Sequence, residues 1–155
     1  MKWIAAHPEF VDLWYDDVDI ETGDFIVEEY DNVDLPVQTA RVLLGAADPH
    51  ALERFDRIRG DGYGKRPPHW ADDSLLALRD VLAVIPDPSQ PRAGVWRLDD
   101  PVVDDLTGKL PWTRRFADEP LAERRQSIEA EWLTARTLHT FVEKAVSDGL
   151  VVIAD

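Results

Sequence analysis

The C-terminal third of the chain carries a long apolar stripe at helical spacing. Residues of the stripe recur three, four or seven positions apart, at Leu121, Ile128, Trp132, Ala135, His139, Val142 and Val146. This pattern predicts one long helix with a single face in the core. Asp118 is expected to cap its start, and Gly149 is expected to end it in the left-handed conformation. Residues 150–154 are then predicted to form a buried strand.

The middle of the chain predicts three shorter helices. One covers residues 37–44. A second begins at Asp48 and Pro49, a cap residue followed by proline at the first helical position. Its apolar stripe stops at Gly60, so residues 60–68 are expected to form a loop. The third follows Asp72 or Asp73 and ends at Pro86.

The N-terminal region favours short strands. Residues 10–15 mix aromatic and branched side chains, with Val11, Leu13 and Tyr15 at alternate positions. Residues 18–20 and 25–27 flank a glycine-containing turn. A short helix over residues 8–15 is the alternative, and the strand interpretation is favoured. Residues 94–98 form a further expected strand. Together these elements predict an α+β fold over a single domain, residues 1–155: a small antiparallel N-terminal sheet against about four helices, one of them long and followed by a short strand.

Composition restricts the class of protein. The 155 residues are 45% hydrophobic, enough for a core that buries about 70% of the unfolded surface. There is no cysteine, so disulfides and thiolate metal sites are excluded. The N-terminal apolar run is too short for a secretory signal, and no run of about 18 apolar residues predicts a bilayer span. We therefore expect a cytoplasmic protein with no membrane partner.

Negative charge is concentrated at the start of the chain. The first 36 residues hold eleven carboxylates against one base, Lys2, a local net charge of −10 out of −14 for the whole chain. Such a field attracts cationic partners over about 8–10 Å at physiological salt and repels nucleic acid. The only basic cluster comprises Arg54, Arg57, Arg59, Lys65 and Arg66. We expect it to pair internally with the acidic N-terminal sheet, and we expect no direct nucleic-acid binding.

Motifs for catalysis are weak. The glycines of residues 60–65 lack the spacing and the Lys-Ser/Thr ending of a phosphate-binding loop. Four carboxylates at Asp99, Asp100, Asp104 and Asp105 have a composition that hard cations accept, but not the spacing of a calcium loop. The four histidines lack metal-ligand spacing, and His139 is expected to be a core or interface residue. We expect no cofactor, no metal and no enzymatic activity.

The sequence therefore favours a protein-binding module that docks an acidic face on a basic partner, as immunity proteins and antitoxins do on nucleases. Carboxylates would supply the long-range attraction and aromatic side chains the desolvated anchors. The predicted partner-binding residues are Asp12, Trp14, Tyr15, Asp16, Asp17, Asp19, Glu21, Glu28, Glu29 and Tyr30. Two alternatives stay open: a small metal-dependent hydrolase that uses the cluster at residues 99–105, and a non-catalytic accessory subunit whose acidity maintains solubility.

Overall fold

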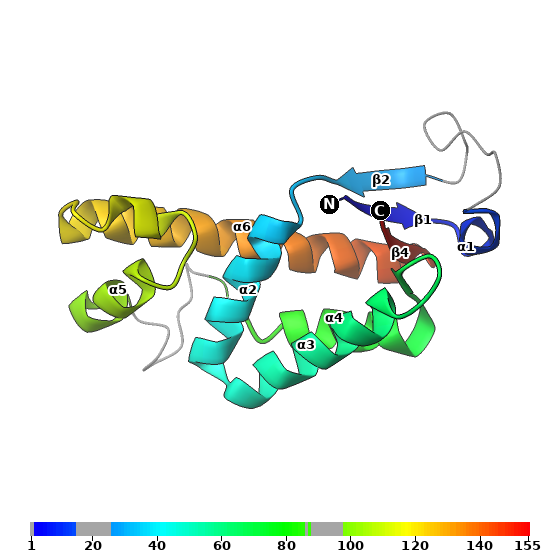
Figure 1. Cartoon of the computed structure of the whole chain (residues 1–155), viewed down its shortest axis with the longest axis horizontal. Helices are drawn as coiled ribbons and strands as arrows, with labels where there is room; N and C mark the ends of the chain where they lie inside the picture. Colours follow the sequence, from blue (N-terminus) through cyan, green and yellow to red (C-terminus); the bar gives the residue numbers. More distant parts are fainter. Residues whose placement is uncertain (1, 15–25, 86, 88–97) are drawn as a thin grey trace.

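The computed structural model describes residues 2–14, 26–85, 87 and 98–155. Within these residues the chain forms a four-stranded sheet and six α-helices (Figure 1). The elements, in order, are β1 (Trp3–Ala6), α1 (Glu9–Leu13), β2 (Ile26–Tyr30), α2 (Asp34–Ala47), α3 (Pro49–Tyr63), β3 (His69–Trp70), α4 (Asp72–Leu82), α5 (Asp100–Thr107), the 3-10 helix η1 (Thr113–Phe116), α6 (Leu121–Ser147) and β4 (Val151–Ala154).

The sheet joins the two ends of the chain. Its strand order is β2-β1-β4-β3, and every pair of neighbours is antiparallel. Ile4 lies opposite Ile153 in the central pair, and the ladder extends to backbone hydrogen bonds between Lys2 and Asp155. The two strands nearest the chain ends therefore form the middle of the sheet.

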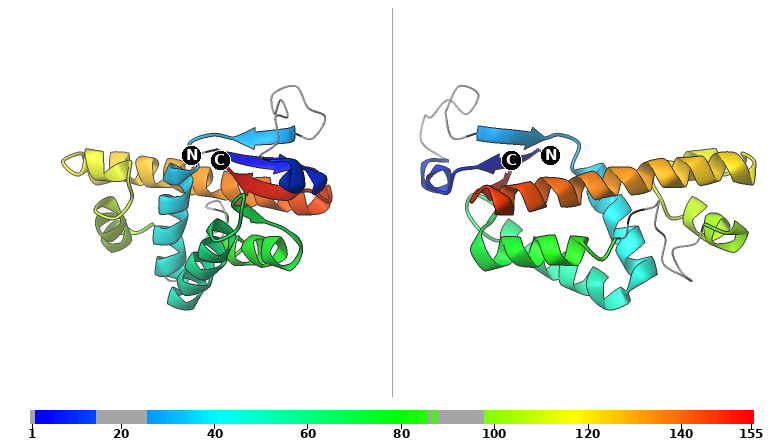
Figure 2. Two further views of the ribbon diagram at one scale, coloured as in Figure 1. Left: turned by 45° about the vertical axis from the view of Figure 1, so that its right-hand side comes forward. Right: turned by 180° about the vertical axis from the view of Figure 1, so that it is seen from behind.

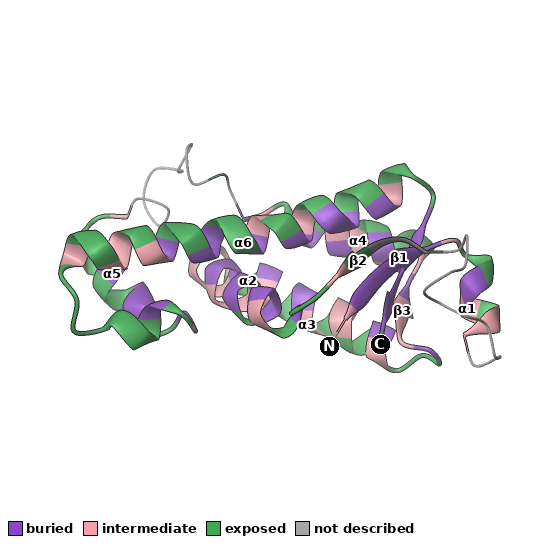
Figure 3. Cartoon of the chain, turned by 90° about the horizontal axis from the view of Figure 1, so that it is seen from above, coloured by how far each residue is buried: buried purple, intermediate pink, exposed green. Residues whose placement is uncertain are grey.

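Both faces of the central strands are buried. Successive side chains of a strand point to opposite faces, so Trp3 and Val152 pack in the main core while Ile4 and Ile153 pack in a second cluster with Phe10. Figure 3 shows β1 buried along its whole length. Strands covered on both sides read as continuous apolar runs without alternation.

Helices cover one face of the sheet. α6 extends along the molecule from the sheet to α5, and α2, α3 and α4 lie together on one side of it (Figure 2). α6 contributes Trp132, Leu138 and Val142 to the main core, whereas Ile128, nearer its start, packs against α5 in a separate cluster. Buried Glu131 accepts hydrogen bonds from the backbone of Trp112 at 2.7 Å and of Thr113 at 2.9 Å, which fixes η1 against α6.

The α+β class, the antiparallel sheet, the long C-terminal helix and the final strand are confirmed. Gly149 has φ +68°, the left-handed conformation expected after the helix. Asp118 as the cap of α6 is wrong. The helix begins at Leu121 after Pro120, whose extended backbone (ψ 153°) places the start beyond the reach of Asp118, and no side chain caps it.

The favoured strand over residues 10–15 is also wrong, because α1 occupies Glu9–Leu13 and the helical alternative holds. The helix brings Phe10 and Trp14 onto one side, where their rings meet edge to face at 5.3 Å. As part of this helix, Phe10 is buried on the outer face of the sheet, and this burial favours the helix over the strand. The expected strand at residues 18–20 and its turn lie outside the described residues, as do residues 94–97.

The expected loop after Gly60 is wrong in part, because α3 continues to Tyr63 and β3 follows at His69–Trp70. Trp70 is fully buried and donates its indole N–H to the carbonyl of Ile58 at 2.9 Å. The absence of a side chain at Gly62 admits this ring: a Cβ there would lie 2.1 Å from the indole. Gly62 thus serves packing, and neither Gly60 nor Gly62 ends the helix.

Replacement of Trp132 by Ala should lower the free energy of unfolding by about 3–5 kcal/mol, because this fully buried indole would leave a cavity. Urea denaturation measures the change. Leu133→Ala is the matched control, since Leu133 is 55% exposed on the same helix, and its cost should stay within about 0.5 kcal/mol. Equal effects of the two changes would contradict the assigned face of α6.

Alanine at Gly60 and at Gly62 should act in opposite directions. Gly60→Ala has open space for its Cβ within a helix, so we expect stabilisation by about 0.5–1 kcal/mol. Gly62→Ala must displace Trp70, so we expect a loss of about 1–3 kcal/mol. Melting temperatures of the two variants test this, and a neutral Gly62→Ala would show that Trp70 is not held as described.

Candidate partner-binding site

The structure describes the side chains of four of the ten predicted partner-binding residues. Tyr15, Asp16, Asp17, Asp19 and Glu21 lie outside the described residues. Glu28 belongs to the backbone of β2, and no placement is described for its side chain. The remaining four fall on two elements: Asp12 and Trp14 in or next to α1, and Glu29 and Tyr30 at the end of β2.

At the end of β2, the predicted residues make contacts within the chain. Glu29 forms an ion pair with Lys2 at 3.1 Å, and Asp31 lies 3.9 Å from the same ammonium group. The hydrogen bond to Glu29, together with the negative charges around it, raises the pKa of Lys2. The Tyr30 hydroxyl lies 2.7 Å from the hydroxyl of Thr137, so Tyr30 is held against α6. This end of the predicted face is partly neutralised.

On α1, the two predicted residues have different roles. Trp14 is half-buried and packs against the outer cluster of the sheet, with its ring against Phe10. Part of the Trp14 side chain is therefore used in packing against the sheet. Asp12 is exposed and has no ion pair among the described residues.

Asp12 also lines a cavity of about 400 Å³ between α1, the start of α4 and the end of α6. The walls are mostly apolar and include Val11, Leu75, Leu76, Val146 and Leu150. Leu76 is 39% exposed, so the apolar wall reaches the surface. Cavities of this size are in the range that proteins use for ligands or for the side chains of partners.

Three polar groups of the cavity can accept hydrogen bonds from a ligand. Two are the carboxylates of Asp12 and Asp72, the latter at the first position of α4. The third is His69, whose Nδ1 lies 2.7 Å from the carbonyl oxygen of Pro67. A carbonyl oxygen only accepts, so Nδ1 donates, and in the neutral ring Nε2 is left as an acceptor. His69 and Asp72 were not among the predicted binding residues, because only the fold brings them beside Asp12.

Negative charge in this cavity has no counterion in the part of the chain that the structure describes. No lysine or arginine is among the described lining residues, and neither Asp12 nor Asp72 has an ion pair there. The carboxyl end of α6, which also lines the cavity through Val146, adds the negative end of a helix dipole. The arrangement suits a group with an apolar stem and a cationic head.

The carboxylates of residues 99–105 have structural roles. Asp99 accepts from the backbone N–H of Val102 and caps α5. Asp100 pairs with Arg125 at 2.9 Å, Asp104 with Arg124 at 2.8 Å and Asp105 with Lys109 at 3.1 Å. The described residues contain no group of three or more His, Asp or Glu side chains arranged to hold a metal ion.

The basic cluster does not pair as expected among the described residues. Arg54, Arg57, Lys65 and Arg66 form no ion pair there, and Arg59 lies over the ring of Phe55 at 5.7 Å. In the described part of the acidic segment, Glu29 and Asp31 form ion pairs with Lys2, the single base of that segment.

Comparisons with protein-family models, with curated proteins and with solved structures returned no match. Within the described residues, no helix is both long enough and apolar enough to span a bilayer.

The burial of His139 predicts that the free energy of unfolding depends on pH. Burial lowers its pKa; Arg136 and Arg79 lower it further, and Glu143, at 3.5 Å, partly offsets these effects. Below the ordinary histidine pKa of about 6.5, the unfolded chain therefore binds the proton more readily than the folded chain. The free energy of unfolding should fall as the pH falls from about 7 to 5, and more steeply than in His139→Gln.

Denaturant titrations at several pH values measure these slopes. His50→Gln is the control, because the side chain of His50 is 86% exposed, and its slope should match that of the unaltered chain. A slope unchanged by His139→Gln would contradict the assigned burial of the imidazole.

Proposed function

We propose that the chain is a protein-binding module that docks its acidic α1 side on a basic partner, as an immunity protein or antitoxin docks on a nuclease. The observation that carries the proposal is the cavity beside α1, in which Asp12, Asp72 and His69 offer acceptors without a cation among the described lining residues. In this proposal the occupant of the cavity is a lysine or arginine side chain of the partner.

The chemistry of such a side chain fits the cavity. Lysine and arginine bury an apolar stem along hydrophobic surface while the charged head reaches polar groups. Here the stem would lie against Val11 and Leu75, and the head would meet the carboxylates of Asp12 and Asp72. Hydrogen bonds between ionised groups are about twice as strong as neutral ones, so an anchor of this kind is favoured over a neutral side chain.

Long-range charge supports the same partner. The net charge of −14, with −10 in the first 36 residues, attracts a cationic surface and raises the association rate at low salt. A site that holds phosphate groups in a nuclease is itself cationic, so a carboxylate-rich surface is complementary to it. Blocking of that site by occupation is the proposed mode of inhibition.

Substitution of Asp12 or Asp72 by Asn should weaken binding of a fluorescently labelled pentapeptide of alternating arginine and leucine by about three- to tenfold each. Asn removes the charge, keeps the size and tolerates the positive φ of 49° at residue 72. Fluorescence polarisation at ~50 mM and ~300 mM salt measures affinity, which should fall with salt for the unaltered chain.

Asp118→Asn is the matched control, because it changes the net charge equally at an exposed position that does not line the cavity. We expect it to weaken binding by less than about twofold. The same three variants, immobilised, should differ in the capture of basic proteins from the native host. Equal behaviour of all three would show that net charge, and not the cavity, governs binding, and would overturn the proposal.

A further inference from the structure

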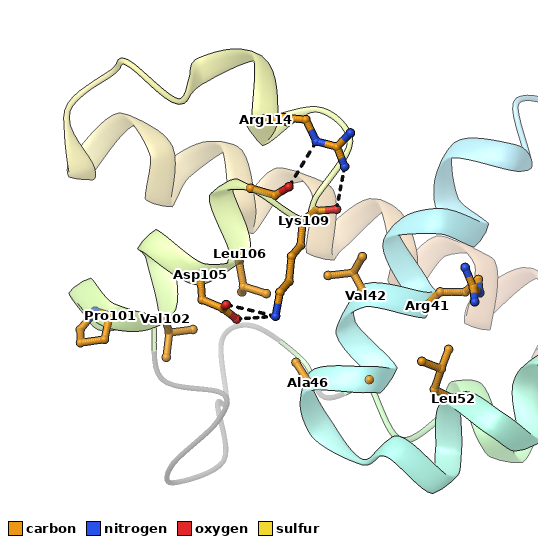
Figure 4. A pocket seen from close by; sticks show the side chains of 12 residues that line it. Arg41, Val42, Ala46, Leu52, Pro101, Val102, Asp105, Leu106, Lys109 and Arg114 are labelled. Atoms are coloured by element: carbon orange, nitrogen blue, oxygen red, sulfur yellow. Dashed lines mark hydrogen bonds and ion pairs between the residues drawn. The ribbon is translucent and has the colours of Figure 1, made fainter.

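A second cavity lies at the other end of the molecule, between α2, the start of α3 and α5 (Figure 4). Its volume is about 680 Å³. α1 and α5 lie at opposite ends of the long axis in Figure 1, so this cavity is separate from the acidic one. Its lining also has the opposite charge.

Three cations line this cavity, Arg41, Lys109 and Arg114, against one carboxylate, Asp105, among the described lining residues. The chain has a net charge of −14, so a random distribution of its charges would rarely give a concave surface with excess positive charge. General attraction between this protein and an anion is absent, so an anion that binds must do so through local contacts.

Two of the cations are held in place by the fold. Arg41 donates to Asp56 through Nε at 2.8 Å and through Nη2 at 2.9 Å, and this pair holds the pKa of Asp56 below its ordinary value. Arg114 donates to the carbonyl oxygens of Gly108 at 3.2 Å and of Lys109 at 3.5 Å, beyond the end of α5.

Both fixed arginines have N–H groups that donate to no described residue. The guanidinium of Arg41 has no partner at Nη1 among the described residues, and Arg114 contacts no carboxylate there, so its charge is not neutralised. Lys109 is held by a single exposed ion pair with Asp105 at 3.1 Å. A pair of this kind contributes little to stability, so its ammonium group is available to a competing anion.

The floor of the cavity is apolar. α2 contributes Val42 and Ala46, α5 contributes Val102 and Leu106, and α3 contributes Leu52. Gly45 lets α2 and α3 approach closely, since a Cβ there would lie 3.2 Å from Leu52. Apolar walls with a few oriented charged groups are typical of small-molecule sites.

We propose that this cavity binds a small organic anion, a phosphate monoester or a carboxylate with a short apolar body. The anionic head pairs with Arg114, and the body lies on Val42 and Leu106. The Lys109 ammonium, which Figure 4 shows on the other side of its own backbone from Arg114, adds positive charge to the same cavity. This site is independent of the proposed docking of a basic partner, because neither the residues nor the charge of the ligand are shared.

Isothermal titration calorimetry with n-hexyl phosphate, and with inorganic phosphate as the headgroup alone, tests the site. We expect hexyl phosphate to bind at least about tenfold more tightly than phosphate, because only the ester covers the apolar floor. Arg114→Gln should weaken binding of the ester about tenfold, and Asp105→Asn should strengthen it severalfold by releasing Lys109. Arg57→Gln, an exposed arginine outside the cavity, should leave binding within about twofold.

Ala46→Leu provides a test that leaves all charges in place. The larger side chain fills part of the cavity, so binding of hexyl phosphate should fall by at least about tenfold while the circular dichroism spectrum is unchanged. Absence of binding of hexyl phosphate at millimolar concentration would overturn the inference. So would equal affinity in Ala46→Leu and the unaltered chain, or equal losses in Arg114→Gln and Arg57→Gln.

Discussion

The pairing of β1 with β4 is the contact on which the rest of the structure depends. It joins residues 3–6 to residues 151–154, the largest separation in sequence of any two paired strands described, and places them at the centre of the sheet. Because β4 follows α6 directly, the pairing also fixes where the long helix lies. α2 and α4 then bury their apolar faces against α6, and Phe10 covers the outer face of the sheet. Closing so long a loop costs chain entropy that only the combined burial on both faces offsets.

Four of the six α-helices in the described residues, α2, α3, α4 and α6, could be predicted from sequence because their information is local. The segment of α1 was favoured as a strand, and α5 was not predicted. Periodicity located α2, α4 and α6, and the sequence Asp48-Pro49 located the start of α3, since caps and stripes act within a few residues. β1 and β3 could not be found in this way. β1 is four consecutive buried residues without alternation, and β3 has two residues, so neither has a period to detect. Their identity as strands comes from β4, a partner distant in sequence.

The candidate site was predictable only in part for the same reason. Charge density along the chain pointed to α1 and selected Asp12, which does line the acidic cavity. His69 and Asp72 are about sixty residues further on, and they reach the cavity because β3 pairs with β4 beside α1. Conversely, Glu29 and Tyr30 have the expected residue types, but Glu29 is paired with Lys2 and the Tyr30 hydroxyl is hydrogen-bonded to Thr137. Sequence supplies the types of residue, whereas tertiary contacts decide which of them remain unpaired.

The two cavities separate opposite charges along one rigid element. α6 spans 27 residues, about 40 Å of helix, and its carboxyl end lines the acidic cavity while its first half supports α5 beside the cationic one. A separation of that length exceeds the Debye length of about 8 Å at physiological salt, so the two potentials do not cancel in solution. Each cavity therefore presents its own charge to an approaching molecule, and a cationic partner at the α1 end leaves the electrostatics of the α5 end unchanged.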